Sequence, residues 1–252
     1  MGSRWSALKA RVSNRLARHL LVTPLRLQGN EPMVSFTFDD VPQSAATAGA
    51  AILQDYDARG TFYVAGQLVD RWSHDWNDNG ISPDQIVALH RSGHEIGCHT
   101  FSHRMNSALD AAAMAAEIAT NRGYVEKLDG SIRLENFAYP YGLAALAHKR
   151  RLGQAFRSSR GILPGVNHGV VDLHFLRATP LISGATDHGG LARVIDEAVE
   201  TSGWLIFYTH DVAASPSRYG CTPDLLRHAL SAATQRRMPI VSVAEALRRA
   251  GA

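Results

Sequence analysis

Three groups of polar side chains in this sequence have the residue types and spacing that metal-assisted hydrolysis needs. Asp39 and Asp40 are adjacent in VSFTFDDVP, His99 and His103 stand four residues apart in HTFSH, and His210 follows the apolar run LIFYT. Two neutral imidazoles and one carboxylate bind a cation and leave positions open for water and substrate. A cation also cancels the repulsion between the adjacent aspartates, so one carboxylate ligates it and the other stays free as a base.

Each group also has an ordinary structural interpretation. Paired aspartates after a strand often cap the next helix, with one carboxylate in water. The spacing in HTFSH brings both imidazoles to one face on a helical turn. A single histidine such as His210 fits a core or a surface equally well. The case for a site therefore depends on whether the fold brings the three groups together.

From residue 33 onward, short apolar runs alternate with longer helical patterns. The predicted strands are 33–38, 61–66, 94–100, 160–163, 174–182, 204–212 and 239–243, and residues 133–142 form a further strand and turn. The predicted helices are 43–60, 82–93, 108–128, 145–159, 191–203, 222–238 and 244–252, and residues 66–82 read as a long surface loop. Strands that alternate with helices favour a parallel sheet, and about seven units in this length favour a closed or nearly closed barrel. An open flavodoxin-like sheet is the alternative.

The polar groups stand where the predicted strands end. The aspartates end the first strand, the histidine pair follows the third, and His210 and Asp211 lie at the end of a late one. Tyr139, Pro140 and Tyr141 follow the strand that contains ENF. Because catalytic side chains of βα barrels lie at the carboxyl ends of strands, we expect these groups to meet at one rim.

Composition sets limits on the function. The chain has 252 residues, 45% hydrophobic and 19% charged, which suits a well-packed α/β protein. Its net charge is only +3, so nucleic-acid binding is not expected. Two distant cysteines form no disulfide framework, and no glycine-rich phosphate loop is present. Without an apolar run of membrane-spanning length or a signal peptide, we expect a cytoplasmic protein.

The N-terminal segment differs from the rest. We divide the chain into 1–28, a basic amphipathic helix and linker, and 29–252, the barrel. The apolar residues of the helix recur at helical spacing: Trp5, Leu8, Val12, Leu16 and Leu20. The basic residues up to position 26 have no acidic residue among them: Arg4, Lys9, Arg11, Arg15, Arg18 and Arg26. This pattern is typical of peripheral contact with an anionic membrane through residues 4–20, or of a helix that packs its apolar stripe on the domain.

Four motifs, TFDDVP, HTFSH, FAYPYG and LIFYTH, resemble the successive motifs of the polysaccharide deacetylase family, over residues 33 to 247. The resemblance implies a distorted (β/α) barrel of about seven parallel strands and metal-dependent removal of an N-acetyl group from an amino sugar in a glycan. It implies these roles for matching residues: Asp39 as general base; Asp40, His99 and His103 as ligands of a divalent metal, usually zinc; His210 as general acid; and Tyr141 after Pro140 as a backbone donor to the oxyanion.

The sequence departs from the family pattern in three places. The glycine that commonly follows the aspartates is Val41, for which we expect a negative φ because a β-branched residue disfavours positive φ. The arginine of the third motif, which pairs with the base, is Ala138, so Arg160 or Arg177 must replace it or Asp39 lacks a partner. No acidic residue that orients the histidine is recognisable, and Asp187 and Asp172 are the candidates.

Three functions compete. The leading one is a metal-dependent deacetylase of an N-acetylated oligosaccharide or polysaccharide, or of a lipid-linked precursor at the inner face of the membrane. The second is hydrolysis of another amide C–N bond. The third is a carbohydrate-binding protein without activity, favoured only by Val41 and Ala138. Sugar binding alone needs no base, metal ligands and acid together, so the set of retained residues favours an enzyme.

Overall fold

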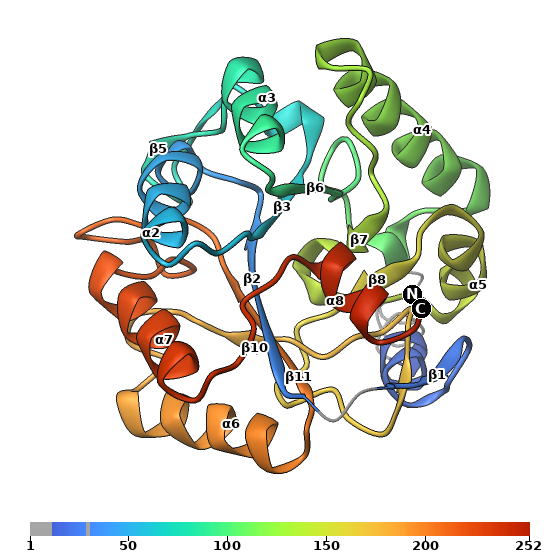
Figure 1. Cartoon of the computed structure of the whole chain (residues 1–252). Helices are drawn as coiled ribbons and strands as arrows, with labels where there is room; N and C mark the ends of the chain where they lie inside the picture. Colours follow the sequence, from blue (N-terminus) through green and yellow to red (C-terminus); the bar gives the residue numbers. More distant parts are fainter. Residues whose placement is uncertain (1–11, 29–30) are drawn as a thin grey trace.

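A curled sheet of seven parallel strands forms the centre of the protein in the computed structural model, which describes residues 12–28 and 31–252 (Figure 1). The strand order is β10-β11-β2-β3-β6-β7-β8. These strands are β2 (Met33–Asp39), β3 (Thr61–Val64), β6 (Glu95–Cys98), β7 (Asn136–Ala138), β8 (Ser158–Arg160), β10 (Thr179–Pro180) and β11 (Trp204–Thr209). The predicted α/β architecture, a distorted barrel of about seven parallel strands, is confirmed.

Helices surround the sheet (Figure 1). They are α2 (Ala50–Asp55), α3 (Pro83–Arg91), α4 (Ala111–Leu128), α5 (Leu146–Ala155), α6 (His188–Glu200), α7 (Pro223–Gln235) and α8 (Val243–Arg249). A π-helical turn, Ala45–Gly49, leads into α2, and three short 3-10 turns cover Gly66–Leu68, Asn106–Ala108 and Pro140–Gly142. Helices α2, α3, α4, α5 and α6 each lie in a crossover between parallel strands, whereas α7 and α8 follow β11. Such crossover helices cover the outer side of a parallel sheet.

Strand β2 shows how the sheet delivers a carboxylate to the interior. All seven of its residues are buried, and successive side chains point to opposite faces. Phe36 and Phe38 belong to the main apolar core. On the other face, Ser35 accepts a hydrogen bond from the Trp204 indole at 3.0 Å. Asp39 continues this second series and therefore ends the strand on the inner side.

Two predicted strands are much shorter than expected. Segment 174–182 contributes only β10 and a bridge between Leu176 and Arg160, and segment 239–243 makes only one bridge, from Ile240 to Val34. Two strand pairs were not predicted: β1 (Pro24–Arg26) with β9 (Val170–Asp172), and β4 (Trp72–Ser73) with β5 (Asp78–Asn79) inside the predicted surface loop. Both pairs are antiparallel and very short, so they carry no long alternating pattern.

The N-terminal segment is attached to the domain by regular structure. Residues 12–19 are helical, as predicted, and the part of the predicted helix before residue 12 lies outside the described residues. Within the predicted linker, β1 pairs with β9. None of the helices in the described parts of the chain is both long and apolar enough to cross a membrane.

Candidate active site

Asp39 forms a buried ion pair at the end of β2. The Arg160 guanidinium donates a short hydrogen bond to its Oδ1, and both side chains are almost fully buried. The guanidinium lies 5.0 Å from the ring centre of Tyr63 and 5.6 Å from that of Tyr208. Burial alone raises the pKa of Asp39, but Arg160, followed by His99 and His210, outweighs it and holds the pKa below its usual value.

The register of two neighbouring strands explains how Arg160 reaches this position. Ala138 on β7 and Arg160 on β8 are direct partners, so their side chains project from the same face of the sheet. The guanidinium therefore enters the interior one strand away from the position that the family motif assigns to it. The other predicted candidate, Arg177, is exposed and donates to the Pro164 carbonyl oxygen at 2.9 Å, so it does not replace this contact.

Asp40 and the two histidines of HTFSH meet in one cluster. Asp40 Oδ1 lies 3.2 Å from His103 Nε2 and 3.5 Å from His99 Nε2, and three potential ligand atoms of these residues lie within 4.8 Å of one another. His99 Nδ1 contacts the Ala138 carbonyl oxygen at 2.9 Å, which keeps the proton on Nδ1 and leaves the Nε2 lone pair facing Asp40. The cluster has the donor set and geometry to hold a metal ion.

The electrostatics of the cluster fit a cation. Burial, and then the neighbouring Asp39 and Asp75, raise the pKa of Asp40 well above its usual value, and its Oδ1 is buried without a hydrogen-bond donor. Burial lowers the pKa of His99 to about 4 and that of His103 to about 3, so both imidazoles are neutral at pH 7. A buried carboxylate beside two neutral imidazole lone pairs is costly until a cation offsets its charge, so these residues fit a divalent metal.

The segment that carries the two histidines is not the predicted helical turn. Residues 99–103 form a bend, and Thr100 and His103 have left-handed φ values of 61° and 52°. Glu117 on α4 holds this bend by accepting from the backbone N–H groups of Phe101 and Ser102 at 3.0 and 2.8 Å, and from the Ser102 hydroxyl. The Glu117 carboxylate, which comes from another element, therefore holds this segment in place of helical hydrogen bonds.

Val41 contradicts the prediction of a negative φ. Its φ is 49°, directly after Asp40 at 59°, so two consecutive residues are left-handed. Such values are strained for a β-branched residue and are tolerated when the surroundings enforce them. The Val41 side chain is fully buried in the core, and its carbonyl accepts from Ile81 N–H at 2.9 Å. The turn that family members make with glycine is thus kept here by packing.

His210 stands across the cluster at the end of β11. Its Nε2 lies 3.8 Å from Asp40 Oδ2, and burial lowers its pKa below the usual value. Its buried Nδ1 has no hydrogen-bond partner. Neither candidate for an orienting carboxylate contacts it, because Asp187 caps α6 and Asp172 pairs with Lys149. Asp211 instead accepts from the backbone and hydroxyl of the Ser217 loop.

Pro140 and Tyr141 form the turn that follows β7. Pro140 is buried, whereas the side chain of Tyr141 is 56% exposed and its ring centre lies 4.6 Å from that of His103. Tyr141 is also left-handed, with φ 58°. The chain turns so tightly here that a Cβ on Gly142 would come within 2.1 Å of Ile162. Packing beneath this turn therefore fixes the direction of the Tyr141 backbone.

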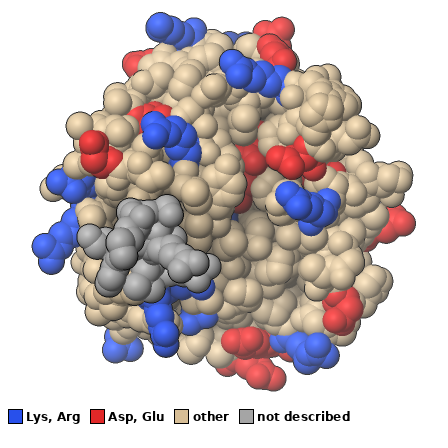
Figure 2. Space-filling model, turned by 180° about the vertical axis from the view of Figure 1, so that it is seen from behind, with Lys and Arg blue, Asp and Glu red and all other residues tan. Residues whose placement is uncertain are grey.

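These side chains share one cleft of about 520 Å³. Its lining residues are Asp39, Asp40, Leu68, Ser73, Asp75, Trp76, His99, Ser102, His103, Tyr141, Gly142, Ile162, Ile182, Tyr208, His210 and Tyr219. Figure 2 shows acidic side chains gathered near the middle of the face opposite to the view of Figure 1. The volume lies in the range of small-molecule binding clefts, and aromatic side chains contribute to its lining.

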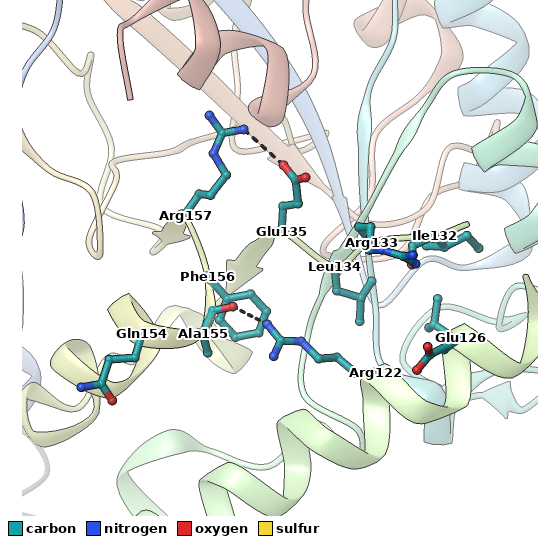
Figure 3. A pocket seen from close by; sticks show the side chains of 11 residues that line it. Arg122, Glu126, Ile132, Arg133, Leu134, Glu135, Gln154, Ala155, Phe156 and Arg157 are labelled. Carbon is teal, nitrogen blue, oxygen red and sulfur yellow. Dashed lines mark hydrogen bonds and ion pairs between the residues drawn. The ribbon is translucent and has the colours of Figure 1, made fainter. Parts of the chain in front are cut away.

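A second hollow, of about 650 Å³, lies between α4, α5 and the strands that follow them (Figure 3). Two of its arginines are engaged with neighbouring groups. Arg157 pairs with Glu135 at 3.2 Å, and Arg122 donates to the Ala155 carbonyl oxygen and covers the Phe156 ring. No histidine and no pair of adjacent carboxylates is among the described residues that line it, so it lacks the combination of side chains that meets in the first cleft.

Sequence reasoning missed two contributors to the site, Glu117 and Asp75. Glu117 lies in a helix far from any motif, and only its tertiary contact shows its role. Asp75 and Trp76 line the cleft from the hairpin that was read as a loop, and Trp76 is buried. The two tryptophans in 66–82 were the available indication, because tryptophan is mostly buried and is uncommon in plain surface loops.

The sequence is similar to those of known deacetylases. The chitin deacetylase of Colletotrichum lindemuthianum is 30% identical over 109 residues, which cover 43% of this chain and 42% of that protein. A peptidoglycan-N-acetylglucosamine deacetylase of Bacillus cereus is 29% identical over 99 residues, covering 39% of this chain and 42% of that protein. The matched segments thus span less than half of these relatives.

A solved structure of the same Colletotrichum lindemuthianum chitin deacetylase has the same fold, with a TM-score of 0.62 at 20% identity, over 88% of this chain and 89% of that one. The family model described as polysaccharide deacetylase matches residues 26–155, a range that contains the aspartates, the histidine pair and Tyr141, but neither Arg160 nor His210. This match covers more than half of the chain, and the chain therefore belongs to the polysaccharide deacetylase family.

Proposed function

We propose that this protein hydrolyses the N-acetyl group of an amino sugar in a glycan or glycan precursor, with a divalent metal, most simply Zn²⁺, held by Asp40, His99 and His103. The observation that carries the proposal is the shared cleft, in which a base paired with Arg160, three metal-binding side chains and a histidine acid surround the same space. Relatives named as chitin and peptidoglycan deacetylases support the substrate class.

The division of labour follows from the surroundings of each aspartate. A bound divalent cation supplies polarisation of the acetyl carbonyl and a more acidic water. Asp39 is kept ionised by Arg160 and accepts a proton from the attacking water. Asp40 faces the imidazoles and not the guanidinium, so it serves as a ligand. The two adjacent aspartates thus have different roles, Asp39 as the base and Asp40 as a metal ligand.

The leaving amine needs a proton, and we assign its delivery to His210. The Nε2 atom of His210 lies 3.8 Å from Asp40 Oδ2, beside the metal-binding cluster, and histidine is the side chain most often used as a general acid. The backbone N–H of Tyr141, fixed by the turn after Pro140, serves as a donor to the developing oxyanion. Removal of one such donor typically lowers kcat about 10²- to 10³-fold.

The test combines metal analysis with acetate release from N-acetylglucosamine oligomers. We expect one bound divalent metal per chain and released acetate. Asp39→Asn should retain the metal and lose activity, whereas Asp40→Asn should lose both. Full activity in Asp39→Asn contradicts the assigned base.

The two alternatives are separated by the same assay. Acetate or amine release from small non-sugar amides, with none from the oligomers, indicates hydrolysis of another C–N bond. Oligomer binding by the metal-loaded protein with no release from any amide indicates a binding protein without activity.

A further inference from the structure

An exposed apolar strip covers one side of the N-terminal segment. Its members are Val12, Leu16, Leu20 and Leu21, with exposed fractions of 50, 43, 47 and 55%. They make up four of the nine large hydrophobic side chains that are exposed in the described residues, and they lie within ten positions of one another. A cluster of this kind marks an interaction surface, whereas scattered exposed residues do not.

The helix of residues 12–19 contacts the domain through its polar side, the reverse of the usual orientation. Ser13 Oγ accepts from the backbone N–H of Leu146 at 3.0 Å, and Asn14 Oδ1 accepts from that of Ala144 at 3.1 Å. Ala17 is the buried contact of this side. The alternative that the helix packs its apolar stripe on the domain is therefore wrong for the described residues.

A buried ion pair fixes this orientation. The Lys149 ammonium donates to the carbonyl oxygens of Ala17 and Leu20 at 2.7 and 2.8 Å and pairs with Asp172 at 2.6 Å. Asp172 in turn accepts from the backbone N–H of Val22 at 2.7 Å. Since these groups lose their partners if the segment rotates, the outward direction of the strip is built into the fold.

The surface beside the strip is cationic. A groove of about 750 Å³ runs between the N-terminal segment and α5, lined by Leu20, Leu21, Val22, Leu146, Ala147, Arg150, Arg151 and Gln154. Both arginines are exposed, and neither residues 12–28 nor α5 contains an acidic residue. An apolar strip beside charges of a single sign complements a surface that is apolar inside and anionic outside.

We propose that the apolar strip and the groove dock this protein onto an anionic lipid bilayer. Leucine side chains on a convex helix enter the acyl boundary while flanking arginines stay among lipid phosphates. The sequence continues the pattern before the described residues, with Trp5 and Leu8 in the apolar series, and tryptophan is enriched at membrane interfaces. The proposal is independent of the catalytic chemistry.

Docking here places the catalytic cleft beside the bilayer. Ala144 and Leu146, which bond to the N-terminal helix, follow closely on Tyr141 and Gly142, which line the cleft. The side of α5 and β1 in Figure 1 is therefore the side on which we expect the lipid surface.

The test is co-sedimentation of the full chain with vesicles of phosphatidylcholine alone or mixed with phosphatidylglycerol. We expect binding to the anionic vesicles that weakens as NaCl rises. Leu16→Glu with Leu20→Glu, and separately Arg150→Glu with Arg151→Glu, should each lower the partition coefficient at least tenfold. Val199→Glu, at an exposed valine on α6, should bind like the unaltered protein, and thermal melts verify that every variant folds.

Absence of binding to anionic vesicles by the folded protein overturns the proposal, and so does unchanged binding in either double variant. Light scattering tests whether a second copy of the chain covers the strip instead of lipid. A dimer that the Leu16→Glu, Leu20→Glu double variant dissociates, together with no vesicle binding, assigns the strip to that second copy and also overturns the proposal.

Discussion

Ala138 and Arg160 are direct neighbours on adjacent parallel strands, and Arg160 fills from β8 the role that a residue at 138 on β7 was expected to fill. The small side chain at 138 leaves the shared inner face to a single guanidinium. The ion pair with Asp39 is thus made by an arginine from the next strand along the sheet. The following predictions begin from this pair.

Replacement of Arg160 should impair the base. In Arg160→Gln the pKa of Asp39 rises, because burial is no longer opposed by the guanidinium. We expect kcat to fall about 10²-fold and the acidic limb of the pH–rate profile to move to higher pH. Ala138→Arg combined with Arg160→Ala should recover part of the activity. Arg177→Gln, at an exposed arginine, is the control, and an unshifted pH profile in Arg160→Gln contradicts the assignment.

The left-handed conformation of Val41 should make its glycine variant at least as stable as its alanine variant, although glycine is ordinarily the less stable of the two. Truncation of a buried valine to alanine costs about 2 kcal/mol, and further truncation to glycine ordinarily costs about 1 kcal/mol more. At φ 49° glycine relieves roughly 1 kcal/mol or more of backbone strain. We therefore expect Val41→Gly to unfold in urea with a free energy at least equal to that of Val41→Ala.

The fully buried Val64 on β3 provides the comparison, because its φ is not left-handed. There the glycine variant should be clearly less stable than the alanine variant. The same order at both positions would show that the turn at Val41 is unstrained.

Glu117 should act as a positioning residue for the metal site. Loss of its carboxylate frees two backbone N–H groups of the bend that carries His103. We expect Glu117→Ala to weaken Zn²⁺ binding about 10- to 100-fold in a competitive chelator titration, and Glu117→Gln to weaken it less. Glu126→Ala, at an exposed position of the same helix, should bind normally. Equal affinity in Glu117→Ala and the unaltered protein rejects this role.

His94 should make stability depend on pH below neutrality. Burial, followed by the charge of Arg59, lowers its pKa to about 4, while the unfolded chain has 6.5. Below pH 6.5 the unfolded chain binds a proton that the folded protein does not, so stability falls as the pH drops from 6.5 towards 4, by up to about 3 kcal/mol. Urea unfolding between pH 7.5 and 5 measures this slope.

His94→Asn keeps an acceptor for the Gly60 N–H and removes the titration, so its slope should be flatter. His168→Asn, at an exposed histidine, should keep the slope of the unaltered protein. An identical slope in all three proteins assigns the pH dependence to other groups.

Features that depend on local chemistry could be predicted from the sequence. The βα alternation predicted the parallel sheet, and the strand ends located the cluster. The helix predicted over 82–93 is α3, which begins with a capping box between Ser82 and Gln85. Each of these rests on residue spacing or on the properties of one residue type.

Features that depend on strand register or on strained backbone conformations could not be predicted from the sequence. Nothing local shows that 138 and 160 are partners, because a shift of one residue between β7 and β8 would send the arginine outward. The left-handed φ of Val41 opposes its intrinsic preference and is enforced by distant packing. The orientation of the N-terminal helix also opposes its pattern, since a buried lysine from α5 outweighs the tendency of leucine to face inward.

The contacts of Lys149 also have a geometric consequence. Lys149 on α5 donates hydrogen bonds to the backbone carbonyl groups of Ala17 and Leu20, so the N-terminal segment is held directly against the domain. The apolar strip and the cleft therefore keep a constant separation. A protein built in this way holds its cleft at a fixed distance from any surface that the strip touches. Substrates presented at that height are within reach, and those held much farther from the surface are not.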